Sequence, residues 1–235
     1  MMPRQIASSI MLCWISLALA GSAAASPTAA ALQAYTATLV GMPLHNWVGN
    51  AVYLGDGHIL TASHVAGSIG HPPPVVEIAG TTLPTTRLKQ GRFEDIDLSL
   101  LGVDVNALPK EFRALPKLTI CDDDPDIGTP VLVITPKQIS QSHIVSSAVM
   151  PTGIFPPIVI AKFNTLIADV YSTGNSGSAV FDENTGCLLG IMSRKIEITK
   201  TNTASGYPVK TVVPVAKYYV GPKLVVDFLQ GTGAL

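Results

Sequence analysis

The sequence predicts an all-β protein on the strength of two observations. Short runs rich in Val, Ile, Leu and Thr fill almost the whole chain after its N-terminal stretch, and Gly, Pro, Asn and Asp separate them. Strands bounded by turns give this pattern, whereas an amphipathic helix repeats its apolar positions roughly every 3.6 residues. We expect strands at residues 36–40, 50–54, 75–78, 98–103, 131–134, 158–163, 188–192 and 209–213.

The tail is the one segment with a partly helical pattern. Apolar residues recur through positions 216–229, and Gly221 and Pro222 interrupt them. Proline is favoured in the first turn of a helix. We therefore expect a short C-terminal helix after Pro222.

The first 25 residues have the composition of a secretory signal peptide. Arg4 is their only charged residue, a nearly uncharged apolar run covers residues 6–20, and small residues follow up to Ala25. The run is shorter than the roughly 20 residues that a membrane-spanning helix needs. We expect cleavage near Ala25, with Ala20 and an uncleaved anchor as alternatives. The mature protein is then secreted or periplasmic, soluble and free of the membrane.

Composition excludes several classes of partner. The formal net charge is -1 and no cluster of Lys and Arg is present, so neither nucleic acid nor an anionic membrane surface is expected as a partner. No Cys or His pair has the spacing of metal ligands, and no cofactor is expected. Cys121 and Cys187 remain in the mature chain, where a disulfide and two buried thiols are both open.

Three segments carry residues suited to catalysis. His64 ends a strand that follows a Gly-Asp-Gly turn, Asp97 directly precedes an apolar strand, and Ser176 lies next to Gly177 and close to Gly174. A general base needs a rigid, exposed position, a buried carboxylate can fix its tautomer, and glycines allow backbone N–H groups to face an oxyanion. Each segment alone is also ordinary turn chemistry. Their occurrence together in the order His, Asp, Ser predicts a nucleophilic triad.

These motifs resemble those of trypsin-like serine proteases. TASHV (residues 61–65) is similar to the family's His motif, DLSLL (97–101) to its Asp motif, and GNSG (174–177) to its Ser motif. The pattern is similar to the compact microbial branch, which includes the glutamyl endopeptidases and the protease domain of the high-temperature-requirement proteases. The resemblance covers essentially the whole mature chain.

The resemblance implies a fold and a set of site residues. The fold is two six-stranded Greek-key β-barrels with the active site in the cleft between them. His64, Asp97 and Ser176 would be the catalytic triad, and the N–H groups of Gly174 and Ser176 the oxyanion hole. Asp95 is the rival carboxylate, but only Asp97 directly precedes the Leu-Ser-Leu-Leu strand.

The same resemblance, together with the turn-rich acidic segment before residue 129, divides the chain. We expect a signal peptide at residues 1–25, an N-terminal barrel at 26–120, a connector at 121–128 and a C-terminal barrel at 129–235. The connector is the polar segment that separates two strand-rich halves. No repeat of fixed period is present.

Substrate-binding residues are also inferred from the resemblance. Asn175 replaces the Asp with which digestive members pair a new N-terminus, so that activation route is not expected. Val170 lies where basic-specific members carry an acid, although a one-residue gap would bring Asp169 there. Ser193 matches the residue that supports the triad Asp, and Lys195 lies at the pocket entrance. We expect a small or aliphatic P1 residue, or an acidic one if Lys195 turns inward.

The expected function is an exported serine endopeptidase acting on protein or peptide substrates through an acyl-enzyme. The alternatives are a secreted non-catalytic binding protein on a protease fold and a latent protease. An esterase is disfavoured because the Gly-x-Ser-x-Gly elbow and the strand–helix alternation are missing.

Overall fold

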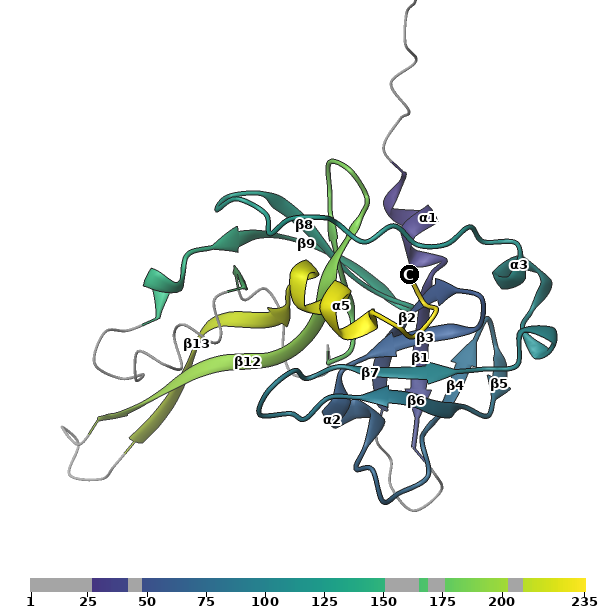
Figure 1. Ribbon diagram of the computed structural model, residues 1–235. Coiled ribbons are helices and arrows are strands. Elements are labelled where there is room, and N and C mark those ends of the chain that lie inside the picture. The colour runs from purple at the N-terminus through teal and green to yellow at the C-terminus, as the bar shows by residue number, and fades with distance from the viewer. Residues whose placement is uncertain (1–26, 42–47, 151–164, 169–175, 203–208) are drawn as a thin grey trace, which may run out of the picture.

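The computed structural model describes residues 27–41, 48–150, 165–168, 176–202 and 209–235, which form two sheets packed side by side (Figure 1). The predicted signal peptide and the predicted strand at 158–163 lie outside these residues. A short helix, α1 (Ala29–Gln33), precedes the first sheet, and Thr28 caps it by accepting a hydrogen bond from the N–H of Ala31.

The first sheet has seven antiparallel strands in the order β5-β4-β1-β2-β3-β7-β6. Buried and exposed positions alternate along β4, which lies next to the edge strand β5, while the central strands are largely buried on both faces because the sheet curls around its own core. The strands are β1 (Thr36–Val40), β2 (Val48–Gly55), β3 (His58–Thr61), β4 (Val75–Ile78), β5 (Thr81–Leu83), β6 (Thr86–Gln90) and β7 (Ser99–Gly102).

The second sheet closes into a six-stranded barrel in the order β10-β13-β12-β11-β8-β9. The strands are β8 (Pro130–Thr135), β9 (Gln138–Val145), β10 (Leu166–Ala168), β11 (Ala179–Asp182), β12 (Leu188–Asn202) and β13 (Val209–Val220). The predicted all-β, two-barrel architecture is confirmed. In detail, the N-terminal unit is a curled sheet of seven strands, in which the edge strands β5 and β6 are not paired with each other among the described residues.

The predicted C-terminal helix is present as α5 (Pro222–Leu229). Pro222 occupies its first turn, and Val225, Phe228 and Leu229 are buried. Residues 216–220, which we expected to be partly helical, belong to β13 instead, because Ala216 and Tyr218 pair with the neighbouring strand β10. The other helical segments are α2 (Ser63–Ala66), α3 (Lys110–Arg113), η1 (Val105–Ala107) and η2 (Ser147–Val149). Within the described residues, no helix has the length and apolarity needed to cross a membrane.

One apolar core joins the two sheets. A single cluster of buried side chains contains Leu60 and Leu100 from the first sheet, Phe181 and Val220 from the barrel, and Phe228 from α5. Lys89 of β6 lies over the Phe228 ring, with Nζ 5.1 Å from the ring centroid, so α5 also covers the first sheet. The loops that meet along the line between the sheets are therefore held on both sides by the same core.

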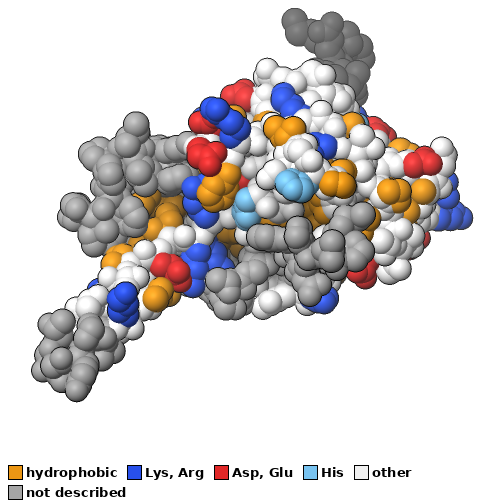
Figure 2. Space-filling model, turned by 90° about the horizontal axis from the view of Figure 1, so that it is seen from below, with side chains coloured by type: hydrophobic (Ala, Val, Ile, Leu, Met, Phe, Trp, Pro, Cys, Tyr) orange, Lys and Arg blue, Asp and Glu red, His pale blue; other side chains and the backbone are white. Residues whose placement is uncertain are grey.

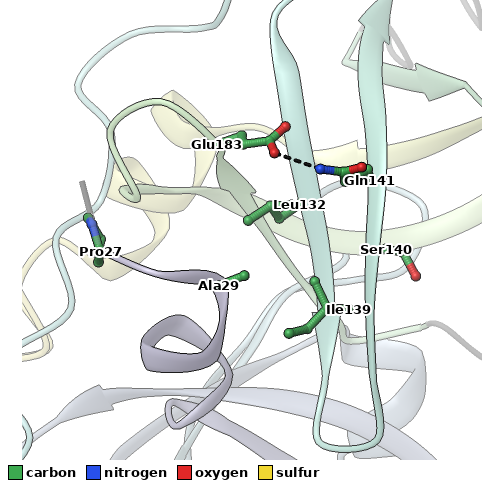
Figure 3. Close-up of a pocket in the computed structure, with 7 residues that line it drawn as sticks. All are labelled: Pro27, Ala29, Leu132, Ile139, Ser140, Gln141 and Glu183. Carbon is green, nitrogen blue, oxygen red and sulfur yellow. Dashed lines mark hydrogen bonds between the residues drawn. The ribbon is translucent and has the colours of Figure 1, made fainter. Parts of the chain in front are cut away.

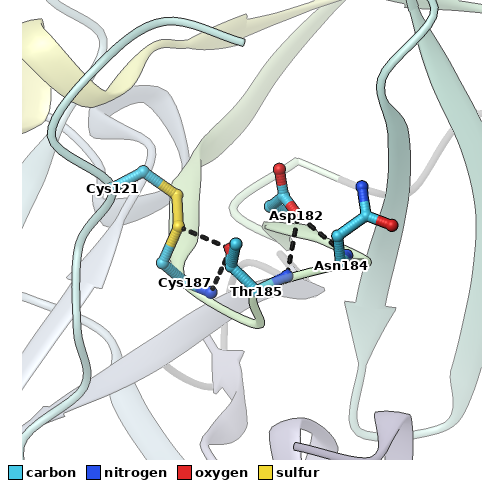
Figure 4. The surroundings of a disulfide bond; sticks show 5 residues. All are labelled: Cys121, Asp182, Asn184, Thr185 and Cys187. Atoms are coloured by element: carbon cyan, nitrogen blue, oxygen red, sulfur yellow. Dashed lines mark hydrogen bonds between the residues drawn. A yellow bond between two sulfur atoms is a disulfide. The ribbon is translucent and has the colours of Figure 1, made fainter. Parts of the chain in front are cut away.

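A disulfide joins Cys121 to Cys187, with the two Cα atoms 5.2 Å apart (Figure 4). The hydroxyl of Thr185 lies 3.1 Å from the Cys187 sulfur, and the Asp182 carboxylate accepts hydrogen bonds from the N–H groups of Asn184 and Thr185 in the same turn. Of the two cysteine states left open by the sequence, the disulfide is thus the one found. It ties the predicted connector to the hairpin of β11 and β12.

Candidate active site

Asp97 is an almost completely buried carboxylate with four hydrogen-bond donors around it. It is 2 % exposed, and its Oδ2 lies 2.8 Å from Nδ1 of His64 and 2.6 Å from the donating hydroxyl of Ser193. Its Oδ1 accepts from the Ser63 hydroxyl at 2.6 Å and from the His64 backbone N–H at 3.1 Å. A carboxylate this enclosed is tolerated only when donors saturate its oxygens.

These donors decide the charge of Asp97. Burial raises its pKa, but the hydrogen bonds from His64, Ser193 and Ser63 outweigh burial and hold the pKa below its usual value. Asp97 is therefore ionised at neutral pH. A negative oxygen at Nδ1 keeps the proton of neutral His64 on that nitrogen and leaves Nε2 as the acceptor.

Strand pairing explains why His64 and Asp97 meet. β3 and β7 are neighbours, with Thr61 opposite Ser99, so the residues just beyond Thr61 and just before Ser99 lie at the same end of the sheet. There the chain turns into α2, whose second residue is His64. The rival Asp95 instead forms an ion pair with Arg92 at the surface, where its side chain is 52 % exposed. The geometry therefore favours Asp97, as the sequence did.

Ser176 is held against the first sheet through its backbone. Its carbonyl accepts a hydrogen bond from the Asn50 N–H at 3.0 Å, and the next N–H, of Gly177, donates to Met192 at 2.8 Å. Gly177 has φ 81°, and a Cβ at this position would lie 1.9 Å from the Asn50 carbonyl oxygen. Only glycine fits there. The contact fixes the serine loop at the line between the two sheets.

Ser193 connects Asp97 to Ser176. Its hydroxyl donates to Asp97, and its carbonyl accepts a 3.4 Å hydrogen bond from the Ser176 hydroxyl. Ser193 is 1 % exposed, so its side chain is positioned to support the Asp97 carboxylate rather than to contact a substrate. Ser176 and His64 are both described, and no hydrogen bond joins their side chains.

Phe93 and Arg194 cover the outer side of His64 from opposite sheets. The Phe93 ring meets the His64 ring edge to face, with centroids 5.3 Å apart. The Arg194 guanidinium lies 3.9 Å from the Phe93 ring centroid and donates to the Phe93 carbonyl at 2.5 Å. The stack bridges the two sheets beside the imidazole and limits its movement.

Two hollows differ in what they can do. The one beside His64, of about 430 Å³, is lined by α2 and by the loop that carries Phe93. Another, of about 610 Å³, lies between the start of α1 and strands β8 and β9; Gln141 donates to Glu183 at 2.8 Å on its wall (Figure 3). The second contains no nucleophile with a neighbouring base. Among the described residues, no three His, Cys, Asp or Glu side chains are grouped as a metal site.

The structure places only some of the predicted substrate-binding residues. Val170, Gly174 and Asn175 lie outside the described residues. Lys195 forms an ion pair with Glu197 at 2.7 Å, so its charge is already partly balanced. An inward turn of Lys195 toward an acidic P1 residue would have to break this pair.

Three residues of the site were missed by the sequence interpretation: Ser63, Asn50 and Phe93. Ser63 directly precedes His64, and its hydroxyl donates to Asp97, which comes 34 residues later in the chain, so no local signal marked this contact. Asn50 and Phe93 act through contacts with the opposite sheet. Sequence position alone could not reveal those contacts.

Comparisons with known proteins point to one family and one fold. A family model described as a trypsin-like peptidase domain matches residues 49–191, more than half of the chain. No curated protein sequence matches the chain.

Solved structures with this fold include three bacterial proteins. Rv3671c of Mycobacterium tuberculosis, as the inactive form of a serine-to-alanine mutant, has a TM-score of 0.60 at 16% identity and covers 96% of this chain and 98% of its own. A serine endoprotease from Yersinia pestis has a TM-score of 0.57 at 18% identity, with 86% and 65% covered. The VesB protease of Vibrio cholerae has a TM-score of 0.54 at 17% identity, with 83% and 62% covered. The predicted resemblance is confirmed.

Proposed function

Because this chain belongs to the trypsin-like peptidase family, we propose that it is an exported serine endopeptidase with Ser176 as nucleophile, His64 as general base and Asp97 as its partner. The observation that carries the proposal is the buried, ionised Asp97 bonded to Nδ1 of an imidazole that is itself partly exposed. A carboxylate in this position fixes the tautomer of the imidazole and stabilises its positive charge when it gains a proton during catalysis.

The reaction proceeds in two steps through an acyl-enzyme. Ser176 Oγ attacks the scissile carbonyl carbon while His64 Nε2 takes its proton, and the imidazolium then gives that proton to the leaving amine. A water molecule, activated by His64 in the same way, releases the acid product and restores the serine. Asp97 keeps the imidazole oriented and stabilises its positive charge throughout.

The oxyanion that forms on the substrate carbonyl would be stabilised by the N–H groups of Gly174 and Ser176. Support comes from the neighbouring peptide groups. The Ser176 carbonyl is held by Asn50 and the Gly177 N–H by Met192, so the backbone on the far side of the nucleophile has a fixed direction.

A latent enzyme is the second candidate, and one contact favours it. The Ser176 hydroxyl donates to the Ser193 carbonyl, which leaves the base without its nucleophile. In an active enzyme this hydroxyl must turn by rotation about its Cα–Cβ bond when substrate binds. In a latent one a further signal would be needed.

Export is supported by the disulfide. Structural disulfides persist in oxidising compartments and are rare in the cytosol. Together with the signal-like N-terminus, the disulfide supports our proposal that the mature protein is periplasmic or extracellular and acts on protein or peptide substrates without a cofactor.

Labelling with a fluorophosphonate probe tests the proposal and separates the candidates. We expect the purified, folded protein to be labelled at Ser176, and Ser176→Ala to remain unlabelled. Asp97→Asn should label far more slowly, because the imidazole loses the partner that fixes its tautomer. Folded protein that fails to react would exclude the active enzyme and leave the latent or non-catalytic alternatives.

A further inference from the structure

Strands β12 and β13 extend well beyond the barrel as a two-stranded arm. β12 has 15 residues, of which only Leu188–Ile191 pair with β11, whereas its pairing with β13 continues to Asn202 opposite Val209. We call residues 197–202 and 209–214 the arm. Figures 1 and 2 show it projecting away from the two packed sheets.

The arm has little of its own to hold it rigid. A two-stranded ribbon is at best marginally stable in water without a further strand or layer. Val212 is 53 % exposed, and Thr199, Lys200 and Lys210 are exposed as well. Among the described residues, positions 196–201 of β12 have no strand partner on the edge opposite β13. The backbone there can accept one more strand.

Charge restricts which strand can pair there. Lys200 and Lys210 form no ion pair within the described part of the chain, whereas Glu197, the one acid of the arm, is bonded to Lys195. Lys200 lies on the open edge strand and Lys210 on the strand paired with it, and both charges repel a second copy of the same arm. An acidic strand would be attracted instead.

The arm is continuous with the catalytic residues. Ser193, whose carbonyl accepts from the Ser176 hydroxyl, belongs to β12, and the strand runs directly from it into the arm. From Lys195 to Asn202 the strand spans roughly 23 Å at about 3.3 Å per residue. A polypeptide cleaved at Ser176 therefore has to extend only along one strand to reach the lysines.

We propose that the arm binds an extended, acidic segment of the polypeptide substrate, which adds as a strand to the edge of β12 at residues 196–201. The proposal rests on the proposed endopeptidase function for the role of that segment as substrate. We therefore expect the preferred substrate to be an unfolded chain that carries an acidic run about seven residues long next to its cleavage site.

Binding can be measured without catalysis. The protein is Ser176→Ala, and the probes are fluorescein-labelled twelve-residue peptides that alternate Glu with Val, Lys with Val, or Glu with Pro. We expect the Glu-Val peptide to bind, and to bind about tenfold more weakly when Lys200→Glu and Lys210→Glu are combined. Lys110→Glu and Lys137→Glu combined, an equal charge change at two exposed lysines outside the arm, should leave its affinity unchanged.

The proline peptide tests strand addition itself. It carries the same acidic charges but lacks alternate N–H groups, so we expect it not to bind. Equal affinity for the Glu-Val and Glu-Pro peptides, or no effect of the Lys200 and Lys210 substitutions, would overturn the proposal. Failure of fluorophosphonate labelling would instead count against the endopeptidase function and leave this binding result intact.

Cleavage then links the arm to turnover. Two unfolded reporter chains share one cleavage sequence, and one of them also carries an acidic run beside it. We expect a higher kcat/KM for the acidic chain with the wild-type protein, and equal values for the two chains with the Lys200→Glu, Lys210→Glu variant. An unchanged preference in that variant would contradict a role of the arm in substrate choice.

Discussion

Replacing Ser193 by alanine removes one of two hydroxyl groups that donate to Asp97 at 2.6 Å. A hydrogen bond to a charged group contributes about 1.5–3 kcal/mol. Burial, which opposes ionisation of Asp97, is unchanged by the substitution. We therefore expect the pKa of Asp97 to rise and the free energy of unfolding at pH 7 to fall by about 2 kcal/mol.

The sign of the pH dependence follows from the low pKa of Asp97. Its ionised form stabilises the fold above the unfolded-state pKa of about 3.9, and this contribution is lost as pH falls through the folded-state pKa. The stability difference between the parent and Ser193→Ala should thus shrink as the pH is lowered from 7 to about 3, because the variant, in which the pKa of Asp97 is higher, is protonated first.

Urea unfolding at the two pH values measures this difference, with Ser176→Ala as the common background to prevent self-cleavage. Ser63→Ala is the matched variant, since Ser63 donates to the other oxygen of Asp97 at the same distance. We expect a similar loss from each. A loss of equal size at both pH values would refute the reasoning, because the hydroxyl groups would then not be stabilising a charge.

Three further results are expected. Gly177→Ala should destabilise the fold by more than about 3 kcal/mol and abolish labelling, because the added Cβ would clash with the Asn50 carbonyl oxygen. The control is Gly233→Ala, at φ 78° with no atom within 4 Å of the added Cβ, which should cost only about 1 kcal/mol. Equal losses of stability for the two variants in thermal unfolding would contradict the clash. The disulfide joins two cysteines 66 residues apart, and its reduction should lower the free energy of unfolding by about 4 kcal/mol. Urea unfolding with and without dithiothreitol measures this loss, and an unchanged unfolding midpoint would count against a structural role of the disulfide. Burial raises the pKa of Tyr218 to about 12, so the free energy of unfolding should decline between about pH 10 and 12, because the tyrosine ionises first in the unfolded chain. The titration is monitored by ultraviolet absorbance, with Tyr218→Phe as the control. A Tyr218 that titrates near pH 10 in the folded protein would contradict this prediction.

Much of the fold could be predicted because, in most strands, the apolar residues that form a run in the sequence are the ones buried in the structure. The expected runs at 36–40 and 75–78 coincide with β1 and β4, and the helix after Pro222 follows from proline's fixed φ. β12 and β13 are longer than expected, since Arg194, Lys195 and Glu197 end the apolar run. Cross-strand pairing extends the strands through these polar residues, and pairing partners far apart in the chain are invisible to a local pattern.

In the candidate site, too, some contacts could be predicted from the sequence and others could not. His64 and Asp97 could be paired from the sequence because each lies beside a strand end, and neighbouring strands bring those ends together. Phe93 and Arg194 could not be paired from the sequence, since their stack joins a loop of the first sheet to strand β12 of the barrel. Ser193 was assigned to support Asp97 by resemblance, and the structure adds its contact with Ser176.

The most direct measurement of the proposed triad is a double-mutant comparison of cleavage rates on a fluorescently labelled, unfolded casein. His64→Ala and Ser176→Ala should each lower kcat by roughly four to six orders of magnitude. Because the two side chains act in one proton transfer, the double variant should retain the same residual rate as either single variant. A Ser176→Ala protein that still cleaves at a substantial rate, or a double variant whose loss is the product of the single losses, would contradict a shared catalytic role.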